Sequence, residues 1–370
     1  MKLIVLCPSL ECNTGWNRYT HDIVMRLAKR VDEVVVICQD KDESAPFRQI
    51  PIMRSAMAYL TNPIATFVDA WKVRSAVAKE VKSYEGECII HCTTEAQGMF
   101  IPFFKGLAAK TYMTTHGTYS VLPLKSIKTR WWYKRVYSTV DRVISVSYYT
   151  KKHLLEHASK YISAEKIFVM TNGVDFVDHP PKAPKSDDVF RIITVGEVKN
   201  RKGGHHLVRV ACVLKEQYDF PFHITFIGKV QKESPYFLGI QEFLKEHNLE
   251  DCVSFAGMIP QEELDRHYET ADLFALLSVH EHGHYEGYPL VFHEAAMWGL
   301  PTIGTYNCGA EDAINDGVTG VLVHPSHHEH IAEKIAAIRN RSINITPEVC
   351  VQWAQENDWD KKDLFSMYKL

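Results

Sequence analysis

Two glutamates in one short segment have the types and spacing to hold a ligand rich in hydroxyl groups. Glu286 and Glu294 are separated by seven residues, and the segment between them begins Gly287-Tyr288-Pro289-Leu290-Val291. Pro289 is suited to begin a helix that runs to about Trp298. Glu294 would then lie inside the helix with its side chain leaning toward the amino end, and Glu286 in the loop beyond that end. Two carboxylates flanking free backbone N–H groups suit a ligand with hydroxyls at both ends and a phosphate between them.

A second candidate is the basic, glycine-rich loop Gly196-Glu197-Val198-Lys199-Asn200-Arg201-Lys202-Gly203-Gly204. Three cations and two glycines ahead of a predicted helix favour a grip on a diphosphate, because Lys and Arg neutralise charge on a leaving phosphate. Taken alone, the loop is explained equally well as a solvated basic turn.

A third candidate follows the first predicted strand, where Gly15 precedes a predicted helix. A glycine there lets the backbone approach a ligand closely, and a helix amino terminus favours anions. A glycine that serves only the turn is an equal alternative. The chain has no G-x-G-x-x-G after its first strand and no Walker loop, which argues against dehydrogenases and P-loop ATPases.

Two further clusters have competing interpretations. His280, His282 and His284 alternate just before Glu286 and could suggest a metal site. A loop that lines a sugar pocket is favoured, because alternating residues on a loop have no fixed ligand geometry. The segment from Lys125 to Tyr137 mixes five cations with adjacent tryptophans. It fits either attachment to an anionic membrane or a helix whose tryptophans pack in the core, and the two interpretations are equally supported.

The elements that must position these residues form a regular series. Short β-branched runs alternate with amphipathic stretches, which is typical of βαβ units and parallel sheets, so the predicted fold class is α/β. The first set of predicted strands comprises Leu3–Cys7, Glu33–Cys38, Cys88–His91, Lys110–Thr115, Arg142–Val146 and Lys166–Thr171. The second comprises Phe190–Gly196, Phe222–Gly228, Cys252–Ala256, Asp272–Leu277, Pro301–Gly304 and Gly320–Val323. Doubly wound sheets bind ligands beyond the carboxyl ends of their strands, where several of the candidate residues lie.

A proline-rich segment from Asp178 to Asp188 separates the two sets and is predicted to be the interdomain linker. We therefore expect two Rossmann-like domains, residues 1–178 and 179–346. The tail, residues 347–370, is predicted to be helical and must bury its aromatic side chains on a folded domain.

Composition narrows the class of protein. The chain has 370 residues and a formal charge of −3, with 46% hydrophobic and 24% charged residues, as in ordinary folded proteins. Near-zero charge argues against a nucleic-acid partner. No stretch is long and apolar enough to span a membrane. Nine cysteines, an odd number, form no disulfide framework and favour reduced thiols, so we expect a cytoplasmic location.

Taken together, these motifs resemble those of the retaining family 4 glycosyltransferases, the "glycosyl transferases group 1" type, which have the GT-B fold. The resemblance rests on Glu286 and Glu294 with Gly299-Leu300-Pro301, on Asp316–Val323, on Gly15 with Arg18-Tyr19-Thr20, on Thr115-His116-Gly117 and on Asn172-Gly173-Val174-Asp175. It extends over nearly the whole chain and implies two domains that face a central cleft, with the tail returning to the first domain.

The resemblance also implies roles for single residues. Glu294 would bind the ribose of a nucleotide sugar, and Glu286 the transferred sugar. The backbone of Gly287–Val291 would face sugar and phosphate, Arg201 and Lys202 would hold the diphosphate, and His116 would lie near the sugar. Arg201, Lys202, Glu286 and His116 are the predicted catalytic residues, and Gly15 joins the predicted donor-binding set.

One residue departs from the family pattern. Many relatives have arginine directly after the glycine that ends the first strand of the second domain, where this chain has Glu197. A carboxylate repels a diphosphate, so we expect Glu197 to point elsewhere and Arg201 to take the role of that arginine.

The predicted function is retaining transfer of a hexose from a UDP- or GDP-sugar to a hydroxyl of a glycan or lipid-linked glycan, in cell-surface polysaccharide or glycolipid synthesis. The resemblance implies neither a metal nor a cofactor, with the nucleotide sugar as substrate, and peripheral contact with an anionic membrane is the further partner considered. The alternatives are a nucleotide-sugar epimerase of similar fold and a non-catalytic sugar-binding protein.

Overall fold

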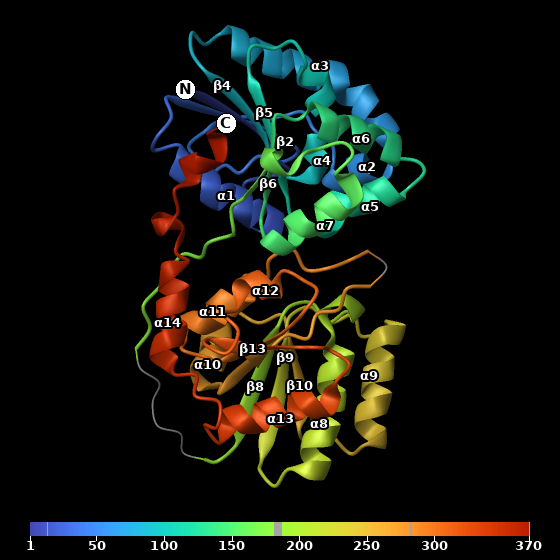
Figure 1. Cartoon of the computed structure of the whole chain (residues 1–370), viewed down its shortest axis with the longest axis vertical. Coiled ribbons are helices and arrows are strands. Elements are labelled where there is room, and N and C mark those ends of the chain that lie inside the picture. The colour runs from blue at the N-terminus through green and yellow to red at the C-terminus, as the bar shows by residue number, and fades with distance from the viewer. Residues whose placement is uncertain (13, 181–186, 282, 370) are drawn as a thin grey trace. The chain divides into compact units, whose positions relative to one another are not determined.

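The computed structural model describes residues 1–12, 14–180, 187–281 and 283–369, and it separates into two compact units. Unit 1 consists of Met1–Asn172 together with Lys362–Leu370, and unit 2 of Gly173–Lys361. Each unit has its own parallel sheet with helices packed around it (Figure 1). The fold class is therefore α/β with two doubly wound domains, as predicted.

The sheet of unit 1 has the strand order β3-β2-β1-β4-β5-β6-β7, with every described pair parallel. The strands are β1 (Lys2–Leu6), β2 (Glu33–Cys38), β3 (Arg48–Pro51), β4 (Cys88–Cys92), β5 (Lys110–Thr115), β6 (Arg142–Ser145) and β7 (Ile167–Val169). The helices are α1 (Gly15–Leu27), α2 (Ala56–Thr61), α3 (Pro63–Lys82), α4 (Glu95–Gly98), α5 (Thr118–Lys125), α6 (Arg130–Thr139) and α7 (Tyr148–Ala158), with 3-10 turns η1 (Ile101–Phe104), η2 (Ala164–Lys166) and η5 (Leu364–Tyr368).

The sheet of unit 2 has the order β10-β9-β8-β11-β12-β13, again parallel. Its strands are β8 (Phe190–Val195), β9 (Phe222–Ile227), β10 (Val253–Gly257), β11 (Leu273–Ala275), β12 (Thr302–Thr305) and β13 (Gly320–Val323). Its helices are α8 (Gly204–Gln217), α9 (Pro235–Glu246), α10 (Gln261–Thr270), α11 (Val291–Met297), α12 (Ala310–Ala313), α13 (His328–Arg339) and α14 (Pro347–Glu356), with 3-10 turns η3 (Asn200–Lys202) and η4 (Trp359–Lys361).

Buried central strands explain the sequence pattern. All five residues of β1 are buried, including Lys2, whose ammonium pairs with the buried Glu80 at 2.9 Å. A strand covered by helices on both faces is apolar at successive positions rather than at alternate ones. Such runs were the basis for predicting the strands, and β3 was missed because it is a half-exposed edge strand of four residues ending in Pro51.

In each sheet the strands that follow the first strand are added on one side of it, and the later strands on its other side. The strand order therefore reverses at one switch point. In unit 1 this point lies between β1 and β4, and in unit 2 between β8 and β11. Ligands of doubly wound sheets bind beyond the carboxyl ends of strands at such a point. The loops that follow these four strands carry most of the predicted site residues.

The boundary between the units lies after Asn172, earlier than the predicted position after residue 178. Val174 already pairs with unit 2, because its N–H donates to Asn357 O at 3.1 Å and its carbonyl accepts from Trp359 N at 3.0 Å. The Trp359 ring also covers Gly173, where a Cβ would come within 2.5 Å of it. Of the predicted linker 178–188, residues 181–186 lie outside the described residues.

The tail is divided between the two units, which differs from the expectation that residues 347–370 all return to the first domain. Cys350 and Ala354 of α14 are buried against Ala296 of α11, within unit 2. Only Lys362–Leu370 belongs to unit 1. There the Tyr368 hydroxyl is 2.9 Å from Nδ1 of the buried His91, and the Tyr112 hydroxyl donates to Tyr368 O at 2.9 Å.

Candidate active site

The loop after β8 is shaped by a glycine that no other residue can replace without a clash. Gly203 has φ +69°, and a Cβ at this position would lie 1.7 Å from the Leu277 carbonyl oxygen. The Val279 N–H donates to Arg201 O at 2.9 Å, which ties the loop to the segment after β11. This close approach of two loops places Arg201 and Lys202 at the carboxyl end of the sheet.

Both cations pair with the same buried carboxylate. Glu286 accepts ion pairs from Arg201 Nη1 and from Lys202 Nζ, the latter at 2.9 Å. Burial by itself would raise the pKa of Glu286, but the two positive charges outweigh it and lower the pKa to about 2. Glu286 is therefore ionised at neutral pH, and three of the four predicted catalytic residues form one cluster in unit 2.

A second glycine holds the segment that follows Glu286. The Gly309 N–H donates to Glu286 O at 2.8 Å, and a Cβ on Gly309 would lie 1.8 Å from Gly287 O. A glycine is required at this position because the two backbones are in direct contact.

Glu197 points away from the cluster, as expected. Its carboxylate accepts from Lys199 Nζ at 2.5 Å and from Gln231 Nε2 at 3.2 Å. The hydrogen bond and charge of Lys199 lower the pKa of Glu197. This carboxylate is thus occupied by partners of its own, whereas Arg201 is directed to Glu286.

Glu294 lies on α11, which starts two residues later than predicted. Pro289 precedes the helix, and Leu290 is its N-cap, with the Leu290 carbonyl accepting from Glu294 N at 3.0 Å. Glu294 Oε2 accepts a 3.4 Å hydrogen bond from the buried hydroxyl of Tyr268 in α10. The Tyr288 hydroxyl lies 2.6 Å from Nε2 of the buried His293, so the side chain of Tyr288 braces the loop that the sequence assigned to ligand contact.

In unit 1, His116 follows β5 and is held by neighbours at the switch point. Its Nε2–H donates to Thr93 O at 2.7 Å, and its backbone N–H donates to Glu95 Oε1 at 2.7 Å. Burial lowers the pKa of His116 to about 4, so the imidazole is neutral near pH 7 with the Nε2 proton fixed by Thr93.

Glu95 is a candidate that the sequence interpretation missed. It is fully buried in the short helix α4, and burial raises its pKa to about 7 despite hydrogen bonds from its own N–H and those of His116 and Gly117. Its second oxygen, Oε2, is buried without a hydrogen-bond partner among the described residues. One feature of the sequence could have indicated Glu95, namely its position three residues after the strand β4, which borders the switch point.

Gly15 begins α1, where the Thr14 hydroxyl caps the helix by accepting from Asn17 N at 3.2 Å. Among the described residues, which do not include residue 13, a Cβ on Gly15 would meet no atom within 4 Å. No described side chain or backbone therefore requires a glycine at this position.

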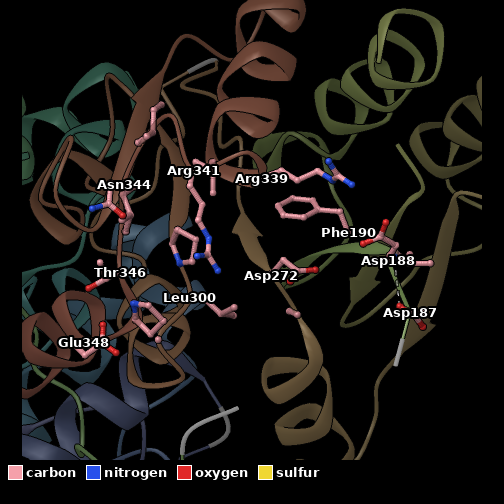
Figure 2. A pocket seen from close by; sticks show the side chains of 18 residues that line it. Asp187, Asp188, Phe190, Asp272, Leu300, Arg339, Arg341, Asn344, Thr346 and Glu348 are labelled. Atoms are coloured by element: carbon pink, nitrogen blue, oxygen red, sulfur yellow. Dashed lines mark hydrogen bonds between the residues drawn. The ribbon is translucent and has the colours of Figure 1, made fainter. Parts of the chain in front are cut away.

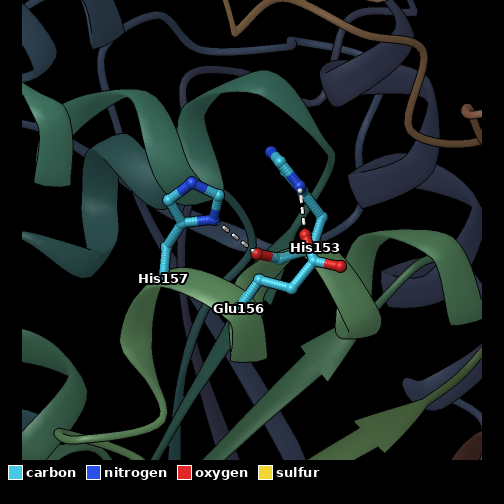
Figure 3. A group of neighbouring side chains, drawn as sticks. All are labelled: His153, Glu156 and His157. Carbon is cyan, nitrogen blue, oxygen red and sulfur yellow. Dashed lines mark hydrogen bonds and ion pairs between the residues drawn. The ribbon is translucent and has the colours of Figure 1, made fainter.

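The histidine-containing loop before Glu286 contacts the basic loop, because Glu281 accepts a hydrogen bond from Asn200 Nδ2, whereas a histidine group of α7 lies in unit 1. His282 lies outside the described residues, and the backbones of Glu281 and His284 bond to each other. His153, Glu156 and His157 come together on one turn of α7 (Figure 3), with His153 Nδ1 3.1 Å from Glu156 Oε2 and His157 Nδ1 bonded to His153 O. These bonds stay within the helix.

A cavity of about 660 Å³ in unit 2 includes Phe190, Asp272 and Pro301 in its lining (Figure 2). These residues begin or precede β8, β11 and β12. The cavity therefore lies at the amino ends of the strands, at the edge of the sheet opposite to the Glu286 cluster.

Comparison with known proteins identifies the family of the chain. Residues 14–177 match the family described as Glycosyltransferase Family 4, and residues 175–356 match Glycosyl transferases group 1. A protein of Escherichia coli K12 named for colanic acid biosynthesis, the glycosyltransferase WcaL, is 32% identical over 178 residues, which are 47% of this chain and 42% of the relative. The chain thus spans less than half the length of this relative.

Two solved structures share the fold. The lipopolysaccharide outer core galactosyltransferase WaaB in its apo form has a TM-score of 0.75 at 15% identity, covering 100% of this chain and 98% of that chain. Anabaena HepE in complex with UDP and glucose has a TM-score of 0.71 at 17% identity, covering 99% and 97%. Because the first half matches Glycosyltransferase Family 4, the second half matches Glycosyl transferases group 1, and both units have this fold, the chain belongs to the family 4, group 1 glycosyltransferases of the GT-B class.

Proposed function

We propose that the protein is a retaining glycosyltransferase that moves a hexose from a UDP- or GDP-sugar to a hydroxyl of a glycan or lipid-linked glycan. The proposal places this reaction in the synthesis of cell-surface polysaccharide or glycolipid, at the cytoplasmic side of the membrane. Family membership supports the reaction class, and the names of WcaL and WaaB, which refer to colanic acid and lipopolysaccharide, support the class of product.

The observation that carries the proposal is the buried Glu286 held by Arg201 and Lys202 at the switch point of unit 2. Two cations and one carboxylate leave a net charge of +1 in a site built by backbone contact. Such a site attracts a diphosphate, and it also contains an acceptor for sugar hydroxyls.

We infer an exchange of partners on donor binding. The two phosphates of the donor compete with Glu286 for Arg201 and Lys202. Once the cations bind the diphosphate, the Glu286 oxygens accept hydrogen bonds from hydroxyls of the transferred sugar. Glu294, which already accepts from a hydroxyl of Tyr268, is assigned to the ribose.

In the proposed reaction, the bond between the anomeric carbon and the diphosphate oxygen breaks while the acceptor oxygen bonds to the same face of that carbon. The acceptor proton passes to the leaving phosphate. Arg201 and Lys202 stabilise the charge on the departing nucleoside diphosphate, which requires no metal ion. Neutral His116 is assigned to the sugar, as a group that accepts a hydrogen bond through Nδ1.

A binding and turnover panel tests the proposal. Calorimetric titration with UDP, GDP and ADP identifies the base, and incubation of the matching nucleotide sugars with a glycan acceptor measures transfer. Lys202→Gln should weaken nucleoside diphosphate binding by about 10- to 100-fold, the value of a charge-assisted hydrogen bond. Glu286→Gln should lower turnover by at least about 100-fold and weaken binding less.

Lys199→Gln is the matched control, because Lys199 is a cation of the same loop that pairs with Glu197 and not with Glu286. Its effect on binding should stay within about twofold. Equal losses for Lys199→Gln and Lys202→Gln would contradict the assigned site. The anomeric configuration of the product, read by proton NMR, tests retention, and turnover in EDTA tests metal independence. Conversion of the donor without acceptor would instead indicate an epimerase.

A further inference from the structure

The first half of α3 is apolar on its exposed side. Ile64, Phe67, Val68 and Trp71 recur at the i, i+3, i+4 and i+7 positions that form one stripe along a helix. Ile64 is 67% exposed, Val68 61% and Trp71 79%. A stripe of this kind normally faces the core of a protein, and here it faces outward.

The core of unit 1 does not need this stripe. The buried positions of α3 lie on its other side, where Thr66, Asp69, Ala70, Val73 and Val77 contact the body of the unit. The helix is also well anchored at its start, since Asn62 Oδ1 accepts from Ile64 N at 3.0 Å. Phe67 also packs on Phe103 and the buried Trp132, whereas the strongly exposed Ile64, Val68 and Trp71 are additional to what folding requires.

Side chains from neighbouring helices extend the stripe. The Phe67 ring stacks on Trp131 of α6, with 5.9 Å between ring centroids and 14° between planes. Helix α2 packs against α3, and its exposed Met57 adds a further apolar side chain to the stripe. The apolar face, as we define it, consists of Met57, Ile64, Phe67, Val68, Trp71 and Trp131. In Figure 1, α2, α3 and α6 lie on the same side of the sheet of unit 1.

Helices α5 and α6, the second of which contributes Trp131 to the apolar face, carry an excess of positive charge. Residues 96–140, which include α5 and α6, contain seven Lys or Arg and no Asp or Glu. Of these, Lys125, Lys128, Arg130 and Arg135 are exposed within or beside the two helices. Residues 55–68 carry no charged side chain at all.

The one carboxylate under the stripe is not available to offset this charge. Asp69 is buried and accepts from Arg54 Nε at 3.0 Å, from Lys72 Nζ at 3.2 Å and from the Tyr59 hydroxyl at 2.9 Å. The face therefore combines aromatic and aliphatic side chains with a one-sided excess of cations.

We propose that this apolar face binds the surface of an anionic lipid bilayer. Trp71, Trp131 and Phe67 would insert at the level of the headgroups, while the cations of α5 and α6 contact anionic lipid. A second copy of the chain fits poorly, because pairing two such faces would bring their cations together. No helix among the described residues has the length and apolar content to cross a bilayer, so the contact is peripheral.

The inference corrects the sequence interpretation of Trp131 and Trp132, in which the pair acted together. Trp132 is 5% exposed, and its Nε1–H donates to Met99 O at 2.9 Å, so it belongs to the core. Trp131 is exposed. The main exposed side chains come instead from α3, in a segment without basic residues that the sequence pattern did not single out.

Co-sedimentation of the full chain with vesicles tests the proposal without any sugar donor. With vesicles of phosphatidylcholine and phosphatidylglycerol at 70:30, most of the protein should pellet at 50 mM salt, and binding should fall at least tenfold at 500 mM. Pure phosphatidylcholine should bind at least tenfold more weakly. The triple variant Ile64→Ser, Val68→Ser, Trp71→Ser should reduce partitioning at least tenfold.

Exposed apolar side chains of unit 2 supply the matched control. Leu238→Ser, Met258→Ser and Val318→Ser remove comparable exposed side chains that are not part of the apolar face, and this variant should bind vesicles like the unmodified chain. Circular dichroism and melting curves verify that both triple variants fold.

Absence of binding to anionic vesicles at 50 mM salt would overturn the proposal. So would equal loss in the two triple variants, or a dimer in sedimentation velocity that the Ile64, Val68 and Trp71 substitutions dissociate, since that result would assign the face to a second copy. The vesicle assay does not measure donor binding, so a negative result would not contradict the proposed glycosyltransferase function. A negative result in the donor-binding and turnover panel would likewise not contradict membrane binding.

Discussion

Three residues of unit 2 illustrate what sequence can predict at the level of side chains. Arg201, Lys202 and Glu286 were selected because a basic glycine loop and a glutamate in a glycine-proline segment are local patterns. Their contact joins positions more than eighty residues apart, at 2.9 Å for Lys202. Only the order of the strands, which puts β8 beside β11, explains why the two loops meet.

Glu95 could not be predicted in the same way, because its chemistry depends on burial. In the sequence it is one acid among 45 Asp and Glu residues. Its unusual pKa arises from removal of the carboxyl from water, which no local pattern reports.

The raised pKa of Glu95 predicts that unit 1 loses stability as pH rises. The folded pKa of about 7 exceeds the unfolded value, so the stabilising contribution is complete below about pH 4.3 and is lost as pH rises through 7. The loss should be about 3 kcal/mol, and Glu95→Gln should remove most of it. Urea unfolding of unit 1 followed at pH 5 and pH 8 measures the difference. Glu165→Gln, on an exposed turn of the same unit, should leave the pH dependence unchanged.

At the level of elements, the buried strands were predicted closely, whereas the half-exposed edge strand β3 was missed. The predicted ranges for β2 and β5 are exact, because each is a continuous apolar or β-branched run. The helix α11 is shorter than predicted, since Pro289 lies in the loop that Gly309 contacts rather than in the first turn.

The loop before α8 gives a prediction about an element. Gly203→Ala combines a positive φ with a collision against Leu277 O, so the loop must move and carry Arg201 and Lys202 with it. We expect loss of more than about 3 kcal/mol of unit 2 stability together with at least tenfold weaker binding of nucleoside diphosphate. Thermal melting and calorimetric titration measure the two effects.

Gly317→Ala provides the comparison for that experiment. Gly317 has φ +76° in the same unit, but its Cβ would meet no atom within 4 Å. Only backbone strain of about 1 to 2 kcal/mol should appear, with nucleotide binding preserved. Equal effects of the two alanines would show that the contact with Leu277 does not control the loop.

At the level of the whole molecule, the family resemblance implied two domains and a tail that returns to the first. It did not indicate that the tail is divided after Lys361, with α14 in unit 2 and Lys362–Leu370 in unit 1. α14 is amphipathic and could pack on either domain as far as its sequence shows. Its small buried residues Cys350 and Ala354 fit closely against Ala296, which depends on the tertiary structure of unit 2.

This division predicts that two aromatic residues in one tail stabilise different units. Tyr368→Ala removes the hydroxyl contact to His91 and the ring contact to Tyr112 in unit 1, whereas Trp359→Ala removes the ring that covers Gly173 in unit 2. Each should cost about 3 to 5 kcal/mol, the usual effect of deleting a buried aromatic side chain. Differential scanning calorimetry should resolve two transitions, with a different one lowered by each variant. A shift of the same transition by both would contradict the division.

The placement of residues 362–370 in unit 1 also bears on how the protein is made. A ribosome releases residues 1–172 first, yet the hydroxyl partner of His91 is synthesised after every residue of unit 2. Unit 2 is a continuous segment and can fold as it emerges, while the interior of unit 1 stays incomplete until residues 362–370 leave the exit tunnel. A chain cut before residue 362 would therefore damage the first-made unit and spare the second, so nascent unit 1 is the part that chaperones have to protect longer.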